Sequence, residues 1–166
     1  MAEPFVPLTG SQVLDLLPQQ EPFRFVDEIL EVGDDHIVAR YTFRPEADFY
    51  RGHFPGNPIT PGVLLIEAMA QTGVVALGIY LVARERGVEE VRRVLTVFTD
   101  VTAEFTGVVR PGDTVTIRAR KVFFRRMKLR SDVEMRLADG SLVATATVAG
   151  MGVEAAPSAA AGGGKP

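Results

Sequence analysis

Residues 50–71, YRGHFPGNPITPGVLLIEAMAQ, join a constrained loop to the longest apolar run of the chain. Three prolines in this stretch, Pro55, Pro58 and Pro61, fix their own backbone φ angles and keep the preceding residues out of the helical region. The loop is therefore stiff, and a stiff loop can hold one side chain in one place. Proline suits the first position of a helix, and Thr60 before it can cap that helix. The pattern therefore predicts a helix from Pro61 to about residue 86.

Glu67 is the only charged residue between positions 62 and 82. A carboxylate alone in an apolar helix is costly unless it is paired, protonated or used in chemistry. Gln71 lies one turn further on and on the same face. One interpretation is a polar edge on an otherwise buried helix. The other is a functional carboxyl group, since perturbed carboxylates gather at active sites but also occur elsewhere. The helix pattern alone leaves both interpretations open.

His53 is the second candidate, and it lies between Gly52 and a Phe-Pro-Gly turn. A single histidine in a loop is more often structural or solvent-exposed than catalytic. This one comes shortly before a helix start, where the backbone N–H groups of Gly62 and Val63 have no helical partner and favour developing negative charge. A base, an acid and an oxyanion site within one stretch indicate a reaction centre.

The segment GHFPGNPITPGVLLIEAMAQ closely resembles the signature of the FabZ-type β-hydroxyacyl-acyl-carrier-protein dehydratases of fatty-acid synthesis. LLPQQEPFRFVDEILEV resembles the opening segment of that family, and FTGVVRPGDTVTIRARKV resembles its later strand-turn-strand segment. The resemblance covers roughly residues 14–150. It implies a hotdog fold of class α+β, in which a mainly antiparallel sheet wraps around one long central helix. It also implies a homodimer with active sites between protomers, often assembled as a trimer of dimers.

The resemblance further implies that (3R)-hydroxyacyl-acyl-carrier protein loses water to give the trans-2-enoyl product, in fatty-acid or related specialised lipid synthesis. His53 would be the base at C2, because histidine titrates near neutral pH. Glu67 would be the acid at the C3 hydroxyl, because apolar surroundings favour a protonated carboxyl group. No metal or organic cofactor is implied, and the acyl chain would lie along the apolar helix. The residues expected to bind substrate are Gly62 and Val63, through oxyanion-binding backbone N–H groups, together with Phe54 and Gln71.

Some positions depart from the family pattern. Arg24 stands in a first strand that usually lacks this charge, Asn57 stands where a second histidine is common, and RRMKLRSDVEM differs from the usual late strand. These differences leave the acyl chain length, the carrier and the pathway open. Glu67 favours dehydration alone, because the related dehydratase-isomerases carry aspartate at the acid position. Two other functions also stay open: a hotdog acyl thioesterase, and a non-catalytic protein that binds the acyl carrier.

Residues 121–130, KVFFRRMKLR, contain five basic residues and no acidic one. Such a segment is more often a solvated strand face with a turn. Acyl carrier proteins are acidic, however, so the resemblance makes it a candidate docking surface formed by Arg125, Arg126, Lys128 and Arg130. A second candidate cluster comprises Arg84, Arg86, Arg92 and Arg93. The sequence does not distinguish which of the two faces the entrance to the site.

Composition argues against several other classes of protein. A net charge of −3 disfavours nucleic-acid binding, which needs a basic surface. The chain has no cysteine and two histidines, so it lacks the residues for a thiolate or histidine-rich metal site. No basic-then-apolar signal segment opens the chain, and the uncharged run 68–82 is shorter than the about 20 residues of a membrane span. We therefore expect a soluble cytoplasmic protein. His36 follows a turn and is assigned no role.

The remaining pattern predicts the sheet and the domain boundary. A short helix is expected at 11–17, and strands are expected at 23–32, 36–43, 94–98, 103–108, 114–124, 128–137 and 142–148. Gly73 and Gly78 in the long helix are expected to allow close approach of neighbouring elements. We expect one hotdog domain over residues 1–152. A disordered Ala/Gly-rich tail over residues 153–166 would follow, since it has little apolar surface to bury.

Overall fold

A six-stranded antiparallel sheet forms most of the structure, a computed structural model that describes residues 6–156. The strands lie in the order β1-β2-β4-β5-β6-β3. Their bounds are β1 Glu28–Val32, β2 His36–Thr42, β3 Val94–Phe105, β4 Thr114–Arg125, β5 Lys128–Leu137 and β6 Leu142–Glu154. The helices are α1 Gly10–Asp15, α2 Gly62–Ala70, α3 Leu77–Arg86 and α4 Val88–Val91, with a 3₁₀ turn at Asp48–Arg51.

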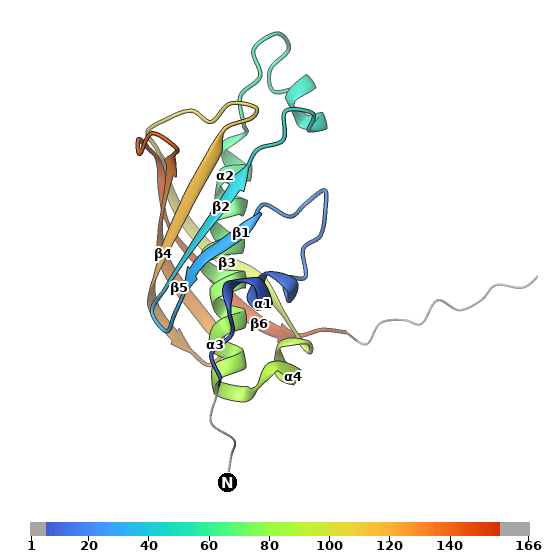
Figure 1. Cartoon of the computed structure of the whole chain (residues 1–166), viewed down its shortest axis with the longest axis vertical. Helices are drawn as coiled ribbons and strands as arrows, with labels where there is room; N and C mark the ends of the chain where they lie inside the picture. Colours follow the sequence, from blue (N-terminus) through green and yellow to red (C-terminus); the bar gives the residue numbers. More distant parts are fainter. Residues whose placement is uncertain (1–5, 157–166) are drawn as a thin grey trace, which may run out of the picture.

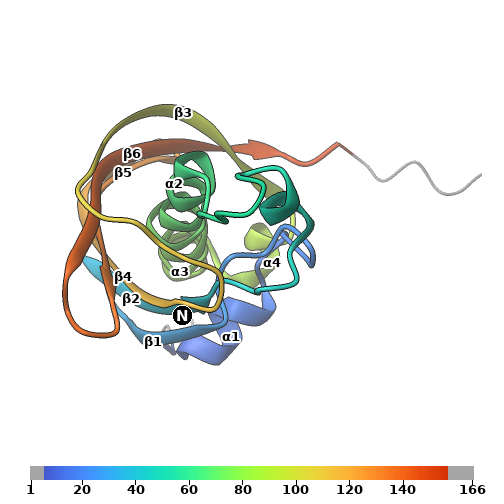
Figure 2. The same ribbon diagram turned by 90° about the horizontal axis from the view of Figure 1, so that it is seen from above.

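One long helix fills the hollow of the curved sheet, as the view from above shows (Figure 2). It consists of α2, a π-helical segment Gln71–Ala76 and α3, which together span 25 residues, Gly62–Arg86. α1 and α4 lie near the α3 end of this helix (Figure 1). The arrangement confirms the predicted α+β hotdog fold.

The two faces of the sheet differ because side chains alternate along each strand. In β4, Val115, Ile117 and Ala119 are fully buried toward the helix, whereas Arg118 and Arg120, which alternate with them, are exposed. The apolar face therefore packs on the central helix and the charged face meets solvent.

Gly73 brings the helix close to the centre of the sheet. A Cβ atom at this position would lie 2.9 Å from Val133 and 3.0 Å from Ala119, closer than real side chains approach. Ser131, which is fully buried, donates a hydrogen bond of 2.7 Å to the Gly73 carbonyl. The predicted close approach is confirmed here. It is wrong at Gly78, where a Cβ would meet only Leu129, at an ordinary 3.7 Å.

The starts of two helices differ from those expected. α1, expected over 11–17, begins at Gly10 because Thr9 caps it through a capping box with Gln12. Thr60 does not cap α2, because Pro61 occupies the N-cap position and the Thr60 hydroxyl is hydrogen-bonded elsewhere.

Three strand boundaries also differ. The strand expected at 23–32 begins at Glu28, because the backbone of residues 23–25 bonds to a side chain of the central helix instead of a neighbouring strand. The two strands expected between 94 and 108 are one strand, β3, with a bulge between Phe98 and Asp100. β6 continues to Glu154, past the expected domain boundary at 152, because its end pairs with Val94. Residues 157–166 of the expected tail lie outside the described residues.

The helix Gly62–Arg86 is long and apolar enough to cross a membrane by length and composition, with a mean hydropathy of 1.7. The expectation that the chain lacks a membrane span considered only the uncharged run 68–82 and not the whole helix. However, 72% of the apolar window is buried inside the protein. It is the core helix of the fold, which is consistent with a soluble protein.

Candidate active site

His53 lies in the loop between the 3₁₀ turn and α2, and its ring is fixed by a backbone contact. Nδ1 lies 2.8 Å from the Ile59 carbonyl oxygen. A carbonyl oxygen only accepts hydrogen bonds, so Nδ1 carries the hydrogen. In the neutral imidazole, Nε2 is then the free acceptor. This tautomer presents a base through Nε2.

The loop around His53 is braced by its own backbone. His53 donates its N–H to Phe49 O at 3.0 Å, and Ile59 donates to His53 O at 2.9 Å. Phe54 stacks on the histidine ring with centroids 4.1 Å apart, and half of its surface remains exposed. Phe54 and Asn57 exchange backbone hydrogen bonds across the turn. These backbone hydrogen bonds add to the stiffness that the prolines are expected to give the loop.

The end of the loop is tied to the core by Thr60. Its buried hydroxyl lies 2.6 Å from the Tyr50 hydroxyl, and its N–H donates to Val109 O at 2.8 Å. Burial raises the pKa of the Tyr50 phenol, so the phenol stays neutral and retains its hydrogen through the physiological range. These contacts fix the place at which the chain enters α2.

Glu67 is half-buried on the second turn of α2, and Gln71 holds its carboxyl group. Gln71 Nε2 donates to Glu67 Oε1 at 2.9 Å and to Phe23 O at 2.8 Å, while Gln71 Oε1 accepts from Phe25 N at 2.8 Å. Gln71 was expected to contact substrate. Its side chain is fully buried, and both amide hydrogens are donated to protein oxygens, one of them to Glu67. The other carboxyl oxygen of Glu67, Oε2, is not bonded to Gln71.

The segment that Gln71 holds is anchored a second time by Asp27, a residue that the sequence patterns did not single out. Asp27 accepts hydrogen bonds from Thr42 N at 2.8 Å and from the Arg44 guanidinium at 2.7 Å. Arg44 also lies over the Tyr41 ring, 5.3 Å from its centroid. The unexpected charge at Arg24 folds back on the chain, with Nε bonded to Val26 O.

The start of α2 presents the two N–H groups expected to bind an oxyanion. Leu64 and Leu65 both donate to Pro61 O, so the N–H groups of Gly62 and Val63 lie ahead of the first hydrogen bonds of the helix. The Phe105 ring of β3 covers this position, since a Cβ at Gly62 would lie 3.1 Å from it. Phe105 is a site residue that sequence reasoning missed, because its pairing with the helix start depends on the tertiary fold.

His53 and Glu67 are held on separate elements. Within residues 6–156, no hydrogen bond joins them. The loop that carries His53 projects beyond the end of the sheet, past the first turn of α2 (Figure 1). Each side chain is thus fixed by its own surroundings.

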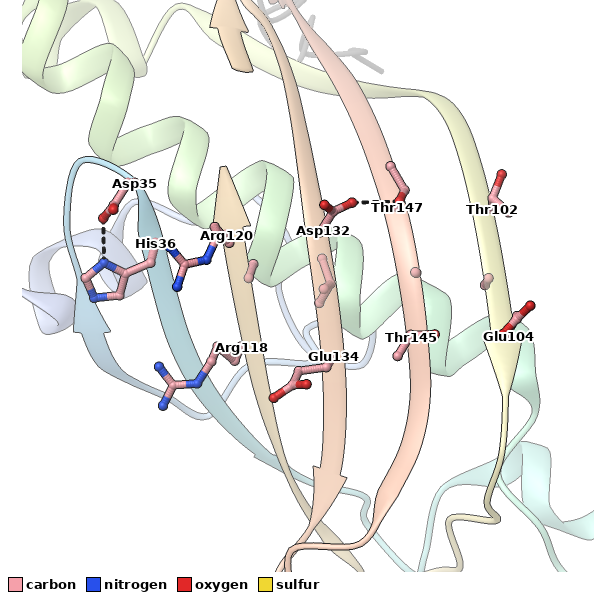
Figure 3. Close-up of a pocket in the computed structure, with 14 residues that line it drawn as sticks. Asp35, His36, Thr102, Glu104, Arg118, Arg120, Asp132, Glu134, Thr145 and Thr147 are labelled. Carbon is pink, nitrogen blue, oxygen red and sulfur yellow. Dashed lines mark hydrogen bonds and ion pairs between the residues drawn. The ribbon is translucent and has the colours of Figure 1, made fainter. Parts of the chain in front are cut away.

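A large hollow lies elsewhere, on the face of the sheet opposite the helix (Figure 3). It has a volume of about 730 Å³ and crosses five strands. His36 lines it, bonded to Asp35 at 2.8 Å, and this hydrogen bond holds the pKa of the Asp35 carboxyl below its usual range. The hollow contains exposed polar side chains but neither His53 nor Glu67, so size does not identify the candidate active site here.

The four basic residues of the expected docking surface differ in their surroundings. Lys128 and Arg130 both pair with Asp100 of β3, at 3.6 Å and 2.7 Å. Arg125 and Arg126 are exposed at the tip of the β4–β5 hairpin. This hairpin lies at the α3 end of the sheet, opposite the His53 loop (Figure 1). Of these four residues, only Arg125 and Arg126 are not paired with Asp100.

The second basic cluster is largely neutralised by its neighbours. Arg84 pairs with Asp34 at 2.6 Å. Arg86 and Arg92 pair with glutamates at 3.8 Å on or beside α4. These pairs favour the β4–β5 hairpin over this cluster as the cationic surface.

Comparison with known proteins identifies the family. Residues 17–149 match the FabA-like domain. The chain is 39% identical to the 3-hydroxyacyl-[acyl-carrier-protein] dehydratase FabZ of Acetivibrio thermocellus over 120 residues, covering 71% of this chain and 77% of that protein. It is 38% identical to the FabZ of Syntrophobacter fumaroxidans, covering 81% and 91%. It also matches the bifunctional enzyme LpxC/FabZ of Chlorobaculum tepidum at 38% identity, but spans 28% of that longer protein.

Solved structures show the same fold. The dehydratase heterocomplex ApeI:P of Xenorhabdus doucetiae aligns with a TM-score of 0.68 at 16% identity, covering 92% of this chain and 93% of that chain. A thioesterase from Haemophilus influenzae aligns with a TM-score of 0.63 at 19% identity, covering 89% and 92%. The fold is thus shared by both kinds of enzyme, and the sequence match decides between them. The chain belongs to the FabA-like family and, within it, to the FabZ-type dehydratases.

Proposed function

We propose that this chain is a 3-hydroxyacyl-acyl-carrier-protein dehydratase that eliminates water across C2–C3. The observation that carries the proposal is the pair of prepared groups in the FabZ-type signature. His53 is held as the tautomer with a free Nε2, and Glu67 has one carboxyl oxygen fixed by Gln71 and the other free. These are the base and the acid that this elimination needs.

The reaction follows from these positions. Nε2 of His53 takes a proton from C2, and the charge that develops on the thioester oxygen is stabilised by the N–H groups at the start of α2. Glu67 donates the proton on Oε2 to the C3 hydroxyl, the C3–O bond breaks, the C2=C3 double bond forms, and water leaves. The proton gained by His53 then returns to Glu67 through solvent, which restores both groups.

The active site is proposed to lie between two protomers. The free edge of β3 has no strand partner within the described residues, although the strand has 12 residues. A long apolar edge strand in contact with water favours pairing with another chain. The exposed apolar side chains on β3 are Leu95, Val97, Phe98, Val101 and Phe105. We propose that the free edge of β3 pairs with β3 of a second copy of this chain. The resulting homodimer can assemble further into a trimer of dimers.

Antiparallel pairing of two β3 edges about a two-fold axis brings the Val94 end of one strand to the Phe105 end of the other. Phe105 covers the start of α2 in its own chain. The Val94 end lies beside the β4–β5 hairpin. Gly152 donates its N–H to the Met127 carbonyl oxygen at 2.8 Å. The side chains of Met127 and Val94 both lie next to Gly152. The hairpin of one protomer would therefore face the helix start of the other. We propose that the acidic carrier docks on the exposed Arg125 and Arg126 in this arrangement.

Two other functions are compatible with the fold, and one assay separates them. A hotdog thioesterase would position water at the carbonyl, and a non-catalytic carrier-binding protein would need neither His53 nor Glu67. Incubation with β-hydroxybutyryl-acyl-carrier protein should produce enoyl absorbance. Release of free thiol without enoyl product would indicate a thioesterase, and neither signal would indicate a binding protein. A cytoplasmic role in fatty-acid or specialised lipid synthesis is the setting proposed for this reaction.

A further inference from the structure

A pair of buried hydroxyl groups joins the two ends of the loop that carries His53. Tyr50 lies in the 3₁₀ turn before the loop, and Thr60 lies directly before Pro61, the N-cap of α2. Both side chains are buried, and their hydroxyl oxygens lie 2.6 Å apart. Because the loop projects beyond the end of the sheet (Figure 1), its position depends on such contacts at its base. The hydroxyl pair closes residues 51–59 into a ring.

One peptide group connects this closure to the imidazole of His53. The carbonyl oxygen of the Ile59–Thr60 peptide accepts a hydrogen bond from His53 Nδ1 at 2.8 Å. The N–H of the same peptide donates to Val109 O, also at 2.8 Å. A peptide group is planar, so the directions of its C=O and N–H are fixed relative to each other. The orientation of the Thr60 N–H therefore sets the direction in which the Ile59 carbonyl meets the imidazole.

The acceptor at the far end of this series is anchored to the sheet. Val109 is fully buried in the connection between β3 and β4. Thr106 and Gly107 of the same connection donate their N–H groups to Val143 O of β6, at 2.8 Å and 3.1 Å. Hydrogen bonds in series polarise one another and so gain strength inside a protein. The sheet thus holds the imidazole through a single peptide group.

We propose that Tyr50 and Thr60 are positioning residues for His53. Their hydroxyl pair holds the Ile59–Thr60 peptide in the orientation that keeps the hydrogen on Nδ1 and leaves Nε2 free as the base. The tautomer of a histidine is set by the hydrogen bond at its other ring nitrogen. Both hydroxyl groups act through His53 and not on the substrate. The inference rests on the proposed dehydratase function for its catalytic consequence, whereas the tautomer can be measured without substrate.

The test separates positioning from stability by removing the hydroxyl groups singly and together. Tyr50→Phe and Thr60→Val each leave one buried hydroxyl without its partner, which should lower the melting temperature. The double variant replaces both by apolar groups of similar shape, so much of the stability should return. In all three variants kcat for β-hydroxybutyryl-acyl-carrier protein should fall about tenfold, because small misplacements of a catalytic group have effects of this size. KM should change little.

The second measurement is the ¹⁵N NMR spectrum of protein labelled in histidine, at about pH 8.5, where free histidine is neutral. The chain has two histidines, so His36→Gln assigns the signals of both. In the wild type, Nδ1 of His53 should give the signal of a nitrogen that carries hydrogen. In the double variant, part of that hydrogen should move to Nε2. Thr60→Ser keeps a hydroxyl group and should preserve the wild-type tautomer and kcat.

Tyr80→Phe is the matched control, because it removes the same atom from a buried tyrosine of α3. It should change neither kcat nor the His53 signals. A kcat that recovers together with the melting temperature in the double variant would overturn the positioning role, and so would unchanged His53 signals in that variant. Either result would leave the dehydratase function intact. Absence of enoyl product from the wild type would instead refute the proposed function, and the catalytic role of the hydroxyl pair with it.

Discussion

The Gln71 amide joins Glu67 to the segment before β1: Nε2 donates to Glu67 Oε1 at 2.9 Å and to Phe23 O at 2.8 Å. Oε1 of the same amide accepts from Phe25 N at 2.8 Å. One fully buried side chain therefore orients the Glu67 carboxyl group and replaces the strand pairing of residues 23–25. A shift in the backbone of residues 23–25 can therefore move the Glu67 carboxyl group through Gln71.

Gln71→Met should lower kcat by about 10- to 100-fold, because small misplacements of a catalytic group have effects of this size. KM should change little, since the amide is buried away from solvent. The melting temperature should also fall, because the Phe23 and Phe25 backbone groups lose their partner. Gln20→Met is the matched control. It removes a hydrogen bond to Leu17 O from an exposed glutamine and should leave kcat unchanged. Equal kcat losses in both variants would contradict a positioning role for Gln71.

The fold could be predicted from sequence, and His53 and Glu67 could be proposed as a catalytic pair, because these signals are local. The prolines before α2, the lone Glu67 and the alternation in β4 and β5 each reflect the physics of neighbouring residues. The roles of Gln71 and Phe105 could not be predicted in this way. The Gln71 amide bonds a segment 46 to 48 residues away, and Phe105 meets Gly62 only once the sheet has curved around the helix. The pairing of Lys128 and Arg130 with Asp100 likewise depends on strand order.

Reversal of the hairpin charges tests carrier docking. Arg125→Glu combined with Arg126→Glu should lower kcat/KM for carrier-bound substrate, most strongly at low salt, where electrostatic steering is strongest. Turnover of an N-acetylcysteamine thioester should hardly change. Arg92→Glu combined with Arg93→Glu reverses two charges in the other cluster and serves as control. A larger loss from that control would move the docking surface there, and equal losses on both substrates would indicate structural damage.

Removal of the C-terminal tail tests the domain boundary. A chain ending at Ala156 should keep its melting temperature and activity, because all of β6 is retained. A chain ending at Met151 loses the residues that pair with Val94, Leu95 and Thr96. It should melt at least about 3 °C lower, since 1 kcal/mol shifts the melting temperature of a chain of this size by about 2–4 °C. A comparable drop for the first truncation would show that the tail contributes to stability.

Stability should fall at alkaline pH, in part through Tyr41. Burial raises the pKa of its phenol from 10.0 to about 12. Between these values the unfolded chain releases the proton while the folded chain retains it, so the free energy of unfolding decreases as pH rises. Denaturant titrations from pH 9 to 11 should show this slope, and Tyr41→Phe should reduce it. The slope should not vanish, because burial also raises the pKa values of Tyr50 and Tyr80. An unchanged slope in Tyr41→Phe would contradict this assignment.

A mixed dimer tests whether His53 of one protomer serves Glu67 of the other. His53→Ala and Glu67→Gln homodimers should each lose at least about 10²-fold in turnover, as general acid–base losses do. In a dimer of one chain of each kind, one shared site lacks both residues and the other retains both. Random pairing of equal amounts gives about half mixed dimers, each with one of two sites intact, so activity should return to about a quarter of wild type. Sites contained within single chains would all lack one residue. A mixture that stays inactive, although mass spectrometry detects mixed dimers, would therefore rule out the shared site.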